Sequence, residues 1–218
     1  MEIALSQHCG PQDVLTPIMS RDEKTRRELG YAGAQNYVAP LAEYRARDWG
    51  RLLLRGRRKS LKNHSPAALV RAFVGERVWN EYYKFCFERN PWDRLVSLYH
   101  WRIRRLSFTP EFEEFAYAAV SPERERQKQY KAGGFFNWPI YTINGSLAVD
   151  RVARYEELED ELRSISHDLS LPWSGPLTKA KSGHRNNSRD YREYYDDTLR
   201  EAVREACAWE IEQLGYQF

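Results

Sequence analysis

The clearest alternation of apolar and polar positions lies at residues 82–105. Residues 82–87 are mostly aromatic with a period of two, which predicts a β-strand. Asn90 and Pro91 follow, a pair typical of the N-cap and first position of a helix, and apolar residues at helical spacing predict a helix over 91–105. This order places the helix N-terminus at the carboxyl end of a strand, where open α/β sheets bind anions.

Amphipathic or well-capped stretches predict the other helices. They are expected over residues 1–8, 41–61, 66–73, 156–169 and 198–214. Asp196 or Asp197 is expected to cap the last helix, and Gly215 to end it.

The remaining stretches predict one hairpin and several loops. Two apolar arms around Asn144-Gly145 predict a hairpin with a two-residue turn, whose second arm continues to Tyr155. Residues 10–40 and 178–190 are expected to be loops, and 106–138 irregular helix and loop.

Composition bounds the class of protein. The chain has 218 residues, of which 42% are hydrophobic and 30% charged, values typical of one globular domain. No apolar run reaches the roughly 20 residues of a membrane helix, and the N-terminus has no signal-peptide pattern. The three cysteines lie far apart, so we expect a reducing, cytoplasmic compartment and no metal site.

The charged residues change this picture in one respect. A net charge of +3 is too small to indicate a nucleic-acid partner. However, 26 of the 34 basic residues are arginines, whose planar guanidinium binds phosphate and sulfate through paired hydrogen bonds. Residues 41–62 are a candidate basic helical insertion. The run from Arg51 to Lys62 is expected to form a solvated face, and the alternative is that it docks an acidic glycan or a membrane surface.

Residues 87–99 read Phe-Glu-Arg-Asn-Pro-Trp-Asp-Arg-Leu-Val-Ser-Leu-Tyr. They resemble the 3′-phosphate-binding motif of the carbohydrate sulfotransferases, Arg-(Asp/Asn/Glu)-Pro-x-(Asp/Glu)-Arg-Leu-Val-Ser-x-Tyr after a strand. Further blocks of these Golgi-type and bacterial enzymes are resembled by residues 149–158, 180–185, 190–195 and 210–218. The resemblance implies transfer of a sulfuryl group from 3′-phosphoadenosine 5′-phosphosulfate (PAPS) to a hydroxyl group. It also implies a P-loop-like three-layer α/β fold over residues 1–218, with a central, mainly parallel sheet and helices on both faces.

By this resemblance Arg89 and Ser97 bind the 3′-phosphate of the nucleotide. An arginine at a strand end can donate to two phosphate oxygens, and a serine two helical turns further on can donate its hydroxyl proton. The alternative for Arg89 is an ion pair with Glu88 or Asp93, and we favour the phosphate contact. For Arg94 we favour a structural ion pair.

Three further residues are candidates for the site. His64 is the candidate base for the acceptor hydroxyl, because related enzymes carry a histidine just before the 3′-phosphate strand; a capping or surface histidine is the equally weighted alternative. Lys181 and His184 lie in a basic, glycine-containing loop that resembles one closing over the nucleotide phosphates. The alternative is a polar loop that binds nothing.

One signature of the family is not found in the sequence. This is a Pro-Lys-(Thr/Ser) loop after an N-terminal strand, which cradles the 5′-phosphosulfate through backbone N–H groups and a lysine. Residues 1–6 resemble the helix that follows this loop, so the chain is expected to begin just after it. If an N-terminal anchor is also missing, a Golgi or membrane location replaces the cytoplasmic one.

The sequence therefore predicts a metal-independent sulfotransferase that moves a sulfuryl group from PAPS to a hydroxyl of a carbohydrate or similar acceptor. The alternative is a truncated, non-catalytic relative that binds the nucleotide or a glycan. The first reading depends on Arg89 and Ser97.

Overall fold

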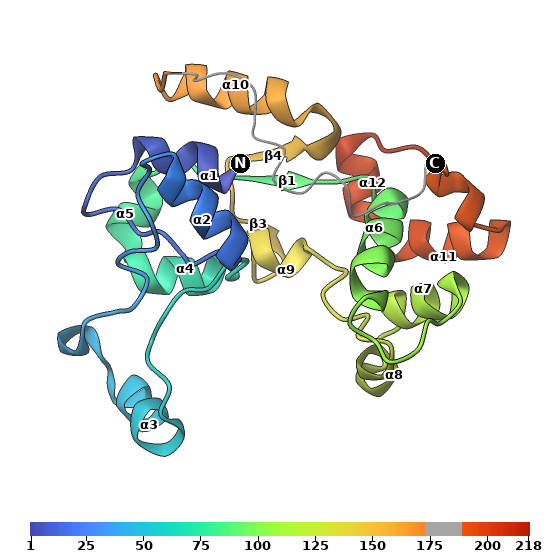
Figure 1. Cartoon of the computed structure of the whole chain (residues 1–218), viewed down its shortest axis with the longest axis horizontal. Helices are drawn as coiled ribbons and strands as arrows, with labels where there is room; N and C mark the ends of the chain where they lie inside the picture. The colour runs from blue at the N-terminus through green and yellow to red at the C-terminus, as the bar shows by residue number, and fades with distance from the viewer. Residues whose placement is uncertain (173–188) are drawn as a thin grey trace. The chain divides into compact units, whose positions relative to one another are not determined.

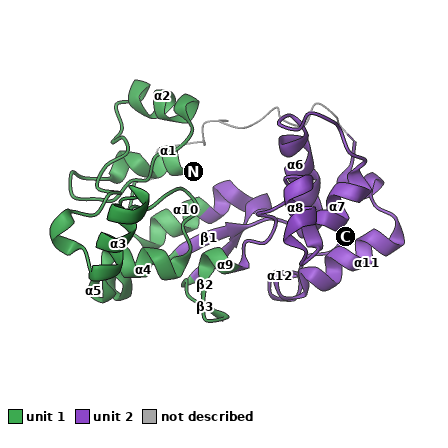
Figure 2. Cartoon of the chain, turned by 90° about the horizontal axis from the view of Figure 1, so that it is seen from below, with its two compact units in different colours: residues 1–84, 139–150, 162–180 green, residues 85–138, 151–161, 181–218 purple. Residues whose placement is uncertain are grey.

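The structure, a computed structural model, describes residues 1–172 and 189–218. These residues divide into two compact units, whose segments alternate along the chain (Figure 2). Unit 1 contains residues 1–84, 139–150 and 162–172, and unit 2 contains residues 85–138, 151–161 and 189–218. The organisation as one domain over residues 1–218 stays a prediction.

Unit 1 consists of short helices and one hairpin. Its elements are α1 (Glu2–Leu5), η1 (Ser6–His8), α2 (Ser20–Glu28), η2 (Leu41–Glu43), α3 (Ala46–Arg55), α4 (Ala67–Val74), α5 (Glu76–Glu81), β2 (Thr142–Ile143) and β3 (Ser146–Leu147). The four-residue helix α9 (Trp138–Tyr141) leads into β2, and most of α10 (Leu158–Asp168) belongs to this unit.

Unit 2 combines a parallel pair of strands with a group of helices (Figure 1). Its elements are β1 (Phe85–Glu88), α6 (Pro91–Ile103), α7 (Phe112–Val120), α8 (Arg124–Gln129), β4 (Arg151–Arg154), η3 (Tyr155–Glu157), η4 (Tyr191–Tyr194), α11 (Asp197–Ala206) and α12 (Ala208–Leu214). Strands β1 and β4 pair in parallel, with Phe85 opposite Arg151 and Glu88 opposite Arg154.

The core of unit 2 lies between α6, α7 and α11. Leu95 and Val96 of α6, Phe115 of α7 and Val203 of α11 are fully buried there. The indole Nε1 of Trp92 donates to the carbonyl oxygen of Arg200 over 3.0 Å, which joins α6 to α11. This packing fixes where α6 begins, and therefore where the turn that precedes it lies.

The parallel strands and the surrounding helices confirm the α/β class. Within the described residues the sheets are small: β1 and β4 form one pair, and β2 and β3 form an antiparallel hairpin. The P-loop-like three-layer arrangement stays a prediction.

The predicted hairpin is confirmed at its turn, shorter than predicted in its first arm and wrong in its second. The first arm is predicted over residues 140–143, but only Thr142 and Ile143 form a strand, because α9 continues to Tyr141. Asn144 and Gly145 have φ angles of +52° and +77°, as a two-residue turn of this kind requires. The antiparallel pairing ends at Leu147, and residues 151–154 form a separate strand that pairs in parallel with β1. A short apolar run does not show which strand it pairs with, because that choice depends on distant residues.

Two predictions for unit 1 are corrected. Residues 20–28 form α2, where the sequence predicts a loop. The pattern does not indicate this helix because all nine of its residues are polar, so it has no apolar period. It buries Arg26, whose guanidinium pairs with Glu23 at 3.1 Å. The helix predicted over 41–61 is confirmed only for Ala46–Arg55, because Gly56 ends it in a left-handed conformation at φ +60°.

No helix in the described part of the chain combines the length and the apolar character that crossing a bilayer requires.

Candidate functional site

The turn from β1 to α6 forms the centre of the candidate site in unit 2. The side-chain oxygen of Asn90 accepts hydrogen bonds from the backbone N–H groups of Trp92 at 3.1 Å and Asp93 at 3.4 Å, and Pro91 occupies the first helical position. The predicted N-cap is confirmed. Because Asn90 takes these two N–H groups, the helix terminus does not present them to a ligand, and an anion must be bound by side chains.

The ends of the two parallel strands bring an arginine and a tyrosine together. Arg89 follows Glu88 at the end of β1, and Tyr155 follows Arg154 at the end of β4, directly across the register. The Arg89 guanidinium lies over the Tyr155 ring, 5.1 Å from its centroid. The Tyr155 side chain is exposed. An aromatic ring at the solvent-facing end of the strand pair therefore supports one face of the guanidinium.

Asp93 holds one edge of the same guanidinium. The Nε and Nη2 atoms of Arg89 lie 2.7 and 2.5 Å from Oδ2 of Asp93, one helical turn into α6. The side chain of Arg89 is 26% exposed, so it is neither sealed inside the protein nor fully solvated. Among the described residues, Nη1 of Arg89 has no hydrogen-bond partner. The ion pair between Arg89 and Asp93, which was the alternative to a phosphate contact, therefore forms. It still leaves the Nη1 edge of the guanidinium available for a ligand.

Ser97 lies one turn beyond Asp93 on α6 and is half-buried. Asp93 and Ser97 are four residues apart, so their side chains project from the same side of the helix. Among the described residues the Ser97 hydroxyl makes no hydrogen bond, which leaves its proton free for an acceptor. The structure thus places the arginine and the hydroxyl along one side of the turn and helix.

Arg94 has a different role from Arg89. Its Nη1 pairs with the fully buried carboxylate of Glu88, and its guanidinium lies over the Phe135 ring at 4.7 Å. Its Nη2 also donates to the thiol of Cys207 at 3.7 Å. The predicted structural ion pair is confirmed: Arg94 points into the interior and holds β1 against α6.

The C-terminal segment stabilises the same turn. The Tyr216 hydroxyl donates to the backbone oxygen of Glu88 at 2.8 Å and lies 3.1 Å from Oε2 of Glu156. The other oxygen of Glu156 accepts the backbone N–H of Asn90 at 2.8 Å. The Asn90 amide donates to the carbonyl oxygen of Gln217 at 3.0 Å. Burial, followed by the charge of Glu156, raises the pKa of Tyr216, so this hydroxyl stays protonated as a donor.

The structure leaves His64 as a prediction. It is an exposed residue of unit 1 with φ +59°, in a turn that the Lys62 N–H closes by donating to the Ser65 hydroxyl at 2.8 Å. Arg89 and Ser97 belong to unit 2. Lys181 and His184 lie outside the described residues. Among the residues that the structure does describe, no three His, Cys, Asp or Glu side chains cluster in a way that would hold a metal ion.

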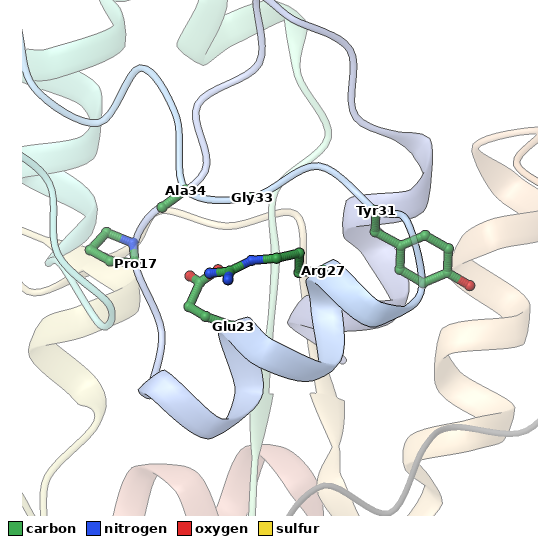
Figure 3. Close-up of a pocket in the computed structure, with 6 residues that line it drawn as sticks. All are labelled: Pro17, Glu23, Arg27, Tyr31, Gly33 and Ala34. Carbon is green, nitrogen blue, oxygen red and sulfur yellow. The ribbon is translucent and has the colours of Figure 1, made fainter.

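A pocket of unit 1 lies apart from these candidates. It has a volume of about 450 Å³ and is lined by residues of α2 and of the loops before and after it (Figure 3): Pro17, Glu23, Arg27, Tyr31, Gly33 and Ala34. Glu23 already accepts hydrogen bonds from Arg26 and from the Ile18 N–H. None of the predicted site residues that the structure describes lines this pocket, so we do not place the reaction there.

The motif around Arg89 agrees with comparisons to known proteins. The sequence profile of the sulfotransferase family matches residues 54–217. The chain belongs to the sulfotransferase family. A protein of Archaeoglobus fulgidus described as uncharacterized is 34% identical over 112 residues, which cover 49% of this chain and 83% of that relative. No solved structure was found to match the chain.

Two contributors to the site were not assigned from the sequence. The sequence indicates Asp93 as a competing partner of Arg89 and Tyr155 as the end of a hairpin arm, and neither as a support of the site. The aromatic residue directly after β4 was a usable signal, but only the parallel pairing of β4 with β1 places its ring beside Arg89.

Proposed function

We propose that this member of the sulfotransferase family binds PAPS through Arg89 and Ser97 and transfers its sulfuryl group to a hydroxyl of a carbohydrate acceptor. The observation that carries the proposal is the placement of the Arg89 guanidinium. It is fixed on one edge by Asp93 and on one face by Tyr155, and its Nη1 edge has no partner among the described residues.

This arrangement suits a phosphate monoester such as the 3′-phosphate of the nucleotide. A guanidinium that is already oriented loses little side-chain entropy when it binds, and its remaining N–H groups can donate to phosphate oxygens. The Ser97 hydroxyl, on the same side of α6, supplies a neutral donor to a further oxygen. The negative charge of Asp93 opposes the ligand charge, so we expect moderate affinity with a clear dependence on ionic strength.

The proposed reaction is a displacement at sulfur. The bond between sulfur and the 5′-phosphate oxygen breaks, a bond between sulfur and the acceptor oxygen forms, and the acceptor proton passes to a base, for which His64 is the proposed group. The products are the sulfate ester and adenosine 3′,5′-bisphosphate. Arg89 and Ser97 act in this scheme by binding and orienting the nucleotide, not by taking part in the bond changes.

Binding of adenosine 3′,5′-bisphosphate tests the site directly. We expect calorimetry to show tighter binding of this compound than of adenosine 5′-monophosphate, which lacks the 3′-phosphate. Arg89→Ala should remove this difference by lowering the affinity for adenosine 3′,5′-bisphosphate roughly 10- to 100-fold, as expected for the loss of a charge-assisted contact. Ser97→Ala should reduce it less, because a neutral donor contributes less.

Arg204→Ala is the control, because Arg204 is an exposed arginine of unit 2 that, like Arg89, pairs with an acidic residue, here Glu201. This variant should bind as the unaltered chain does. Equal affinity for the two nucleotides in the unaltered chain would contradict the proposed 3′-phosphate site.

Transfer of labelled sulfate from PAPS to a carbohydrate acceptor separates an active enzyme from a non-catalytic nucleotide-binding relative. The active enzyme should lose transfer in His64→Ala while its affinity for adenosine 3′,5′-bisphosphate is unchanged. Binding without transfer in the unaltered chain favours the non-catalytic relative.

A further inference from the structure

Helix α3 in unit 1 exposes an unusual amount of apolar surface. Leu53 and Leu54 are 79% and 85% exposed, and Trp49 is 41% exposed. None of the ten residues of α3 is buried, and no other element of the described chain packs closely against it. A ten-residue helix is marginal on its own in water, so its apolar side is expected to have a partner.

The opposite side of the helix is strongly basic. At 3.6 residues per turn, Arg47, Arg51 and Arg55 follow one another along one side, and Trp49, Leu52 and Leu53 lie on the other. The surrounding sequence increases the charge. Between residues 44 and 75 there are nine lysines and arginines and a single acidic residue, Asp48. Asp48 is already engaged, because its carboxylate accepts the N–H of Arg45 at 3.2 Å and caps the helix.

The two chain segments that connect α3 to unit 1 are joined to each other by hydrogen bonds. The N–H of Ala39 donates to the carbonyl oxygen of Lys59 at 2.9 Å. The N–H of Leu61 donates to the carbonyl oxygen of Tyr37 at 2.8 Å. The Tyr44 hydroxyl accepts the Lys59 N–H at 2.9 Å. Residues 40–58 thus form an excursion that carries α3 away from the other helices of unit 1 (Figure 1).

We propose that α3 is a membrane-surface helix that docks the protein on a bilayer containing anionic lipids. The apolar side, with Trp49, Leu53 and the adjacent Leu54, would enter the boundary between headgroups and acyl chains. Arg47, Arg51 and Arg55 would lie among the anionic headgroups. An amphipathic helix with a basic polar side and a tryptophan on the apolar side has the composition that such interfaces favour.

The charges and the exposed leucines favour a lipid surface over other partners. A second copy of the chain would bring two clusters of basic residues together, and one ten-residue helix offers less than the roughly 800 Å² per partner of a stable interface. An acidic polysaccharide would satisfy the arginines but would leave Leu53 and Leu54 in water.

Co-sedimentation of the full chain with vesicles tests the proposal. We expect binding to vesicles of phosphatidylcholine mixed with phosphatidylglycerol, weak binding to phosphatidylcholine alone, and loss of binding as salt is added. Replacing Arg47, Arg51 and Arg55 by serine should lower the partition coefficient on the order of a hundredfold, at about one kcal/mol per basic residue. Leu53→Ser with Leu54→Ser should lower it about tenfold or more, although the net charge is unchanged.

A control of equal charge uses Arg21, Arg77 and Arg124, three exposed arginines outside α3, each replaced by serine. This variant should keep most of the binding. The proposal is overturned if the two triple variants lose binding equally. It is also overturned if the leucine variant binds vesicles as the unaltered chain does, because that result is expected when only the arginines make the contact, as with an acidic polysaccharide. Concentration-dependent dimerisation abolished by the leucine variant, without vesicle binding, assigns the helix to a second copy and also overturns it.

Discussion

The carboxylate of Asp93 holds the Arg89 guanidinium by its Nε and Nη2 atoms, at 2.7 and 2.5 Å, and leaves its Nη1 edge without a partner among the described residues. Asp93 is therefore both a support and an opposing charge. It orients the arginine for a phosphate, yet it lowers the positive potential that the phosphate meets.

The first prediction separates these two effects by substitution of Asp93. Asp93→Asn keeps an oxygen that accepts from Nε but removes the charge, so adenosine 3′,5′-bisphosphate should bind several-fold tighter, for about 1 kcal/mol of relieved repulsion. Asp93→Ala removes the support as well and should bind more weakly than Asp93→Asn. Calorimetric titration of both variants measures the difference. Equal affinity of the two variants would show that Asp93 does not position Arg89.

The second prediction contrasts the two arginines of the motif. Arg94→Ala leaves the fully buried Glu88 without its cation and should lower the free energy of unfolding by about 3–5 kcal/mol. Arg89→Ala breaks a partly exposed pair and should cost about 1 kcal/mol or less. Urea unfolding of each variant provides the measurement.

A double variant serves as the control for the buried pair. Glu88→Gln combined with Arg94→Met removes both charges and should recover a large part of the loss caused by Arg94→Ala. If Arg94→Ala proves no more destabilising than Arg89→Ala, the structural role assigned to the Glu88–Arg94 pair is wrong.

The third prediction concerns the cap of α6. Asn90→Ala removes two accepted hydrogen bonds and the amide donation to Gln217. We expect a loss of about 2 kcal/mol or more, because a cap alone contributes about 1 kcal/mol. Asp196→Ala is the comparison, since the Asp196 side chain accepts one bond, from the Leu199 N–H at 2.7 Å. Thermal unfolding should rank Asn90→Ala as the more destabilised, and the reverse order would count against the link to the C-terminal segment.

The fourth prediction concerns alkaline pH. Burial raises the pKa of the Cys207 thiol from 9.0 to about 12, and burial raises that of Cys86 to about 12 as well. Above pH 9 the unfolded chain releases these protons while the folded chain keeps them, so stability falls as pH rises between about 9 and 12, by up to about 1.4 kcal/mol per pH unit and thiol.

Urea unfolding below and above pH 9 measures this slope. Cys207→Ala should make the decline shallower, even though the substitution lowers stability at neutral pH by leaving a cavity. A slope that is unchanged in Cys207→Ala would mean that the thiol is not protected from ionisation in the folded chain.

Several features of this protein were determined by local sequence alone. The strand predicted over residues 82–87 is confirmed from Phe85 onward. The cap at Asn90, the proline at the first position of α6 and the Asn144-Gly145 turn are confirmed because each depends on neighbouring residues. The motif around Arg89 likewise indicated the family, since its residues are contiguous. These local patterns predict the structure correctly because the hydrogen bonds that they depend on join residues only a few positions apart.

Other features were decided only by tertiary structure. The pairing of β4 with β1 brings Tyr155 to Arg89 across 66 positions of sequence. The polar helix α2 has no apolar period, and it buries Arg26, which pairs with Glu23. The choice of partner for each arginine of the motif, Asp93 for Arg89 and Glu88 for Arg94, also depends on which side chain is buried. Burial and strand pairing arise from residues far apart in the chain, so no local pattern of hydrophobic and polar positions contains them.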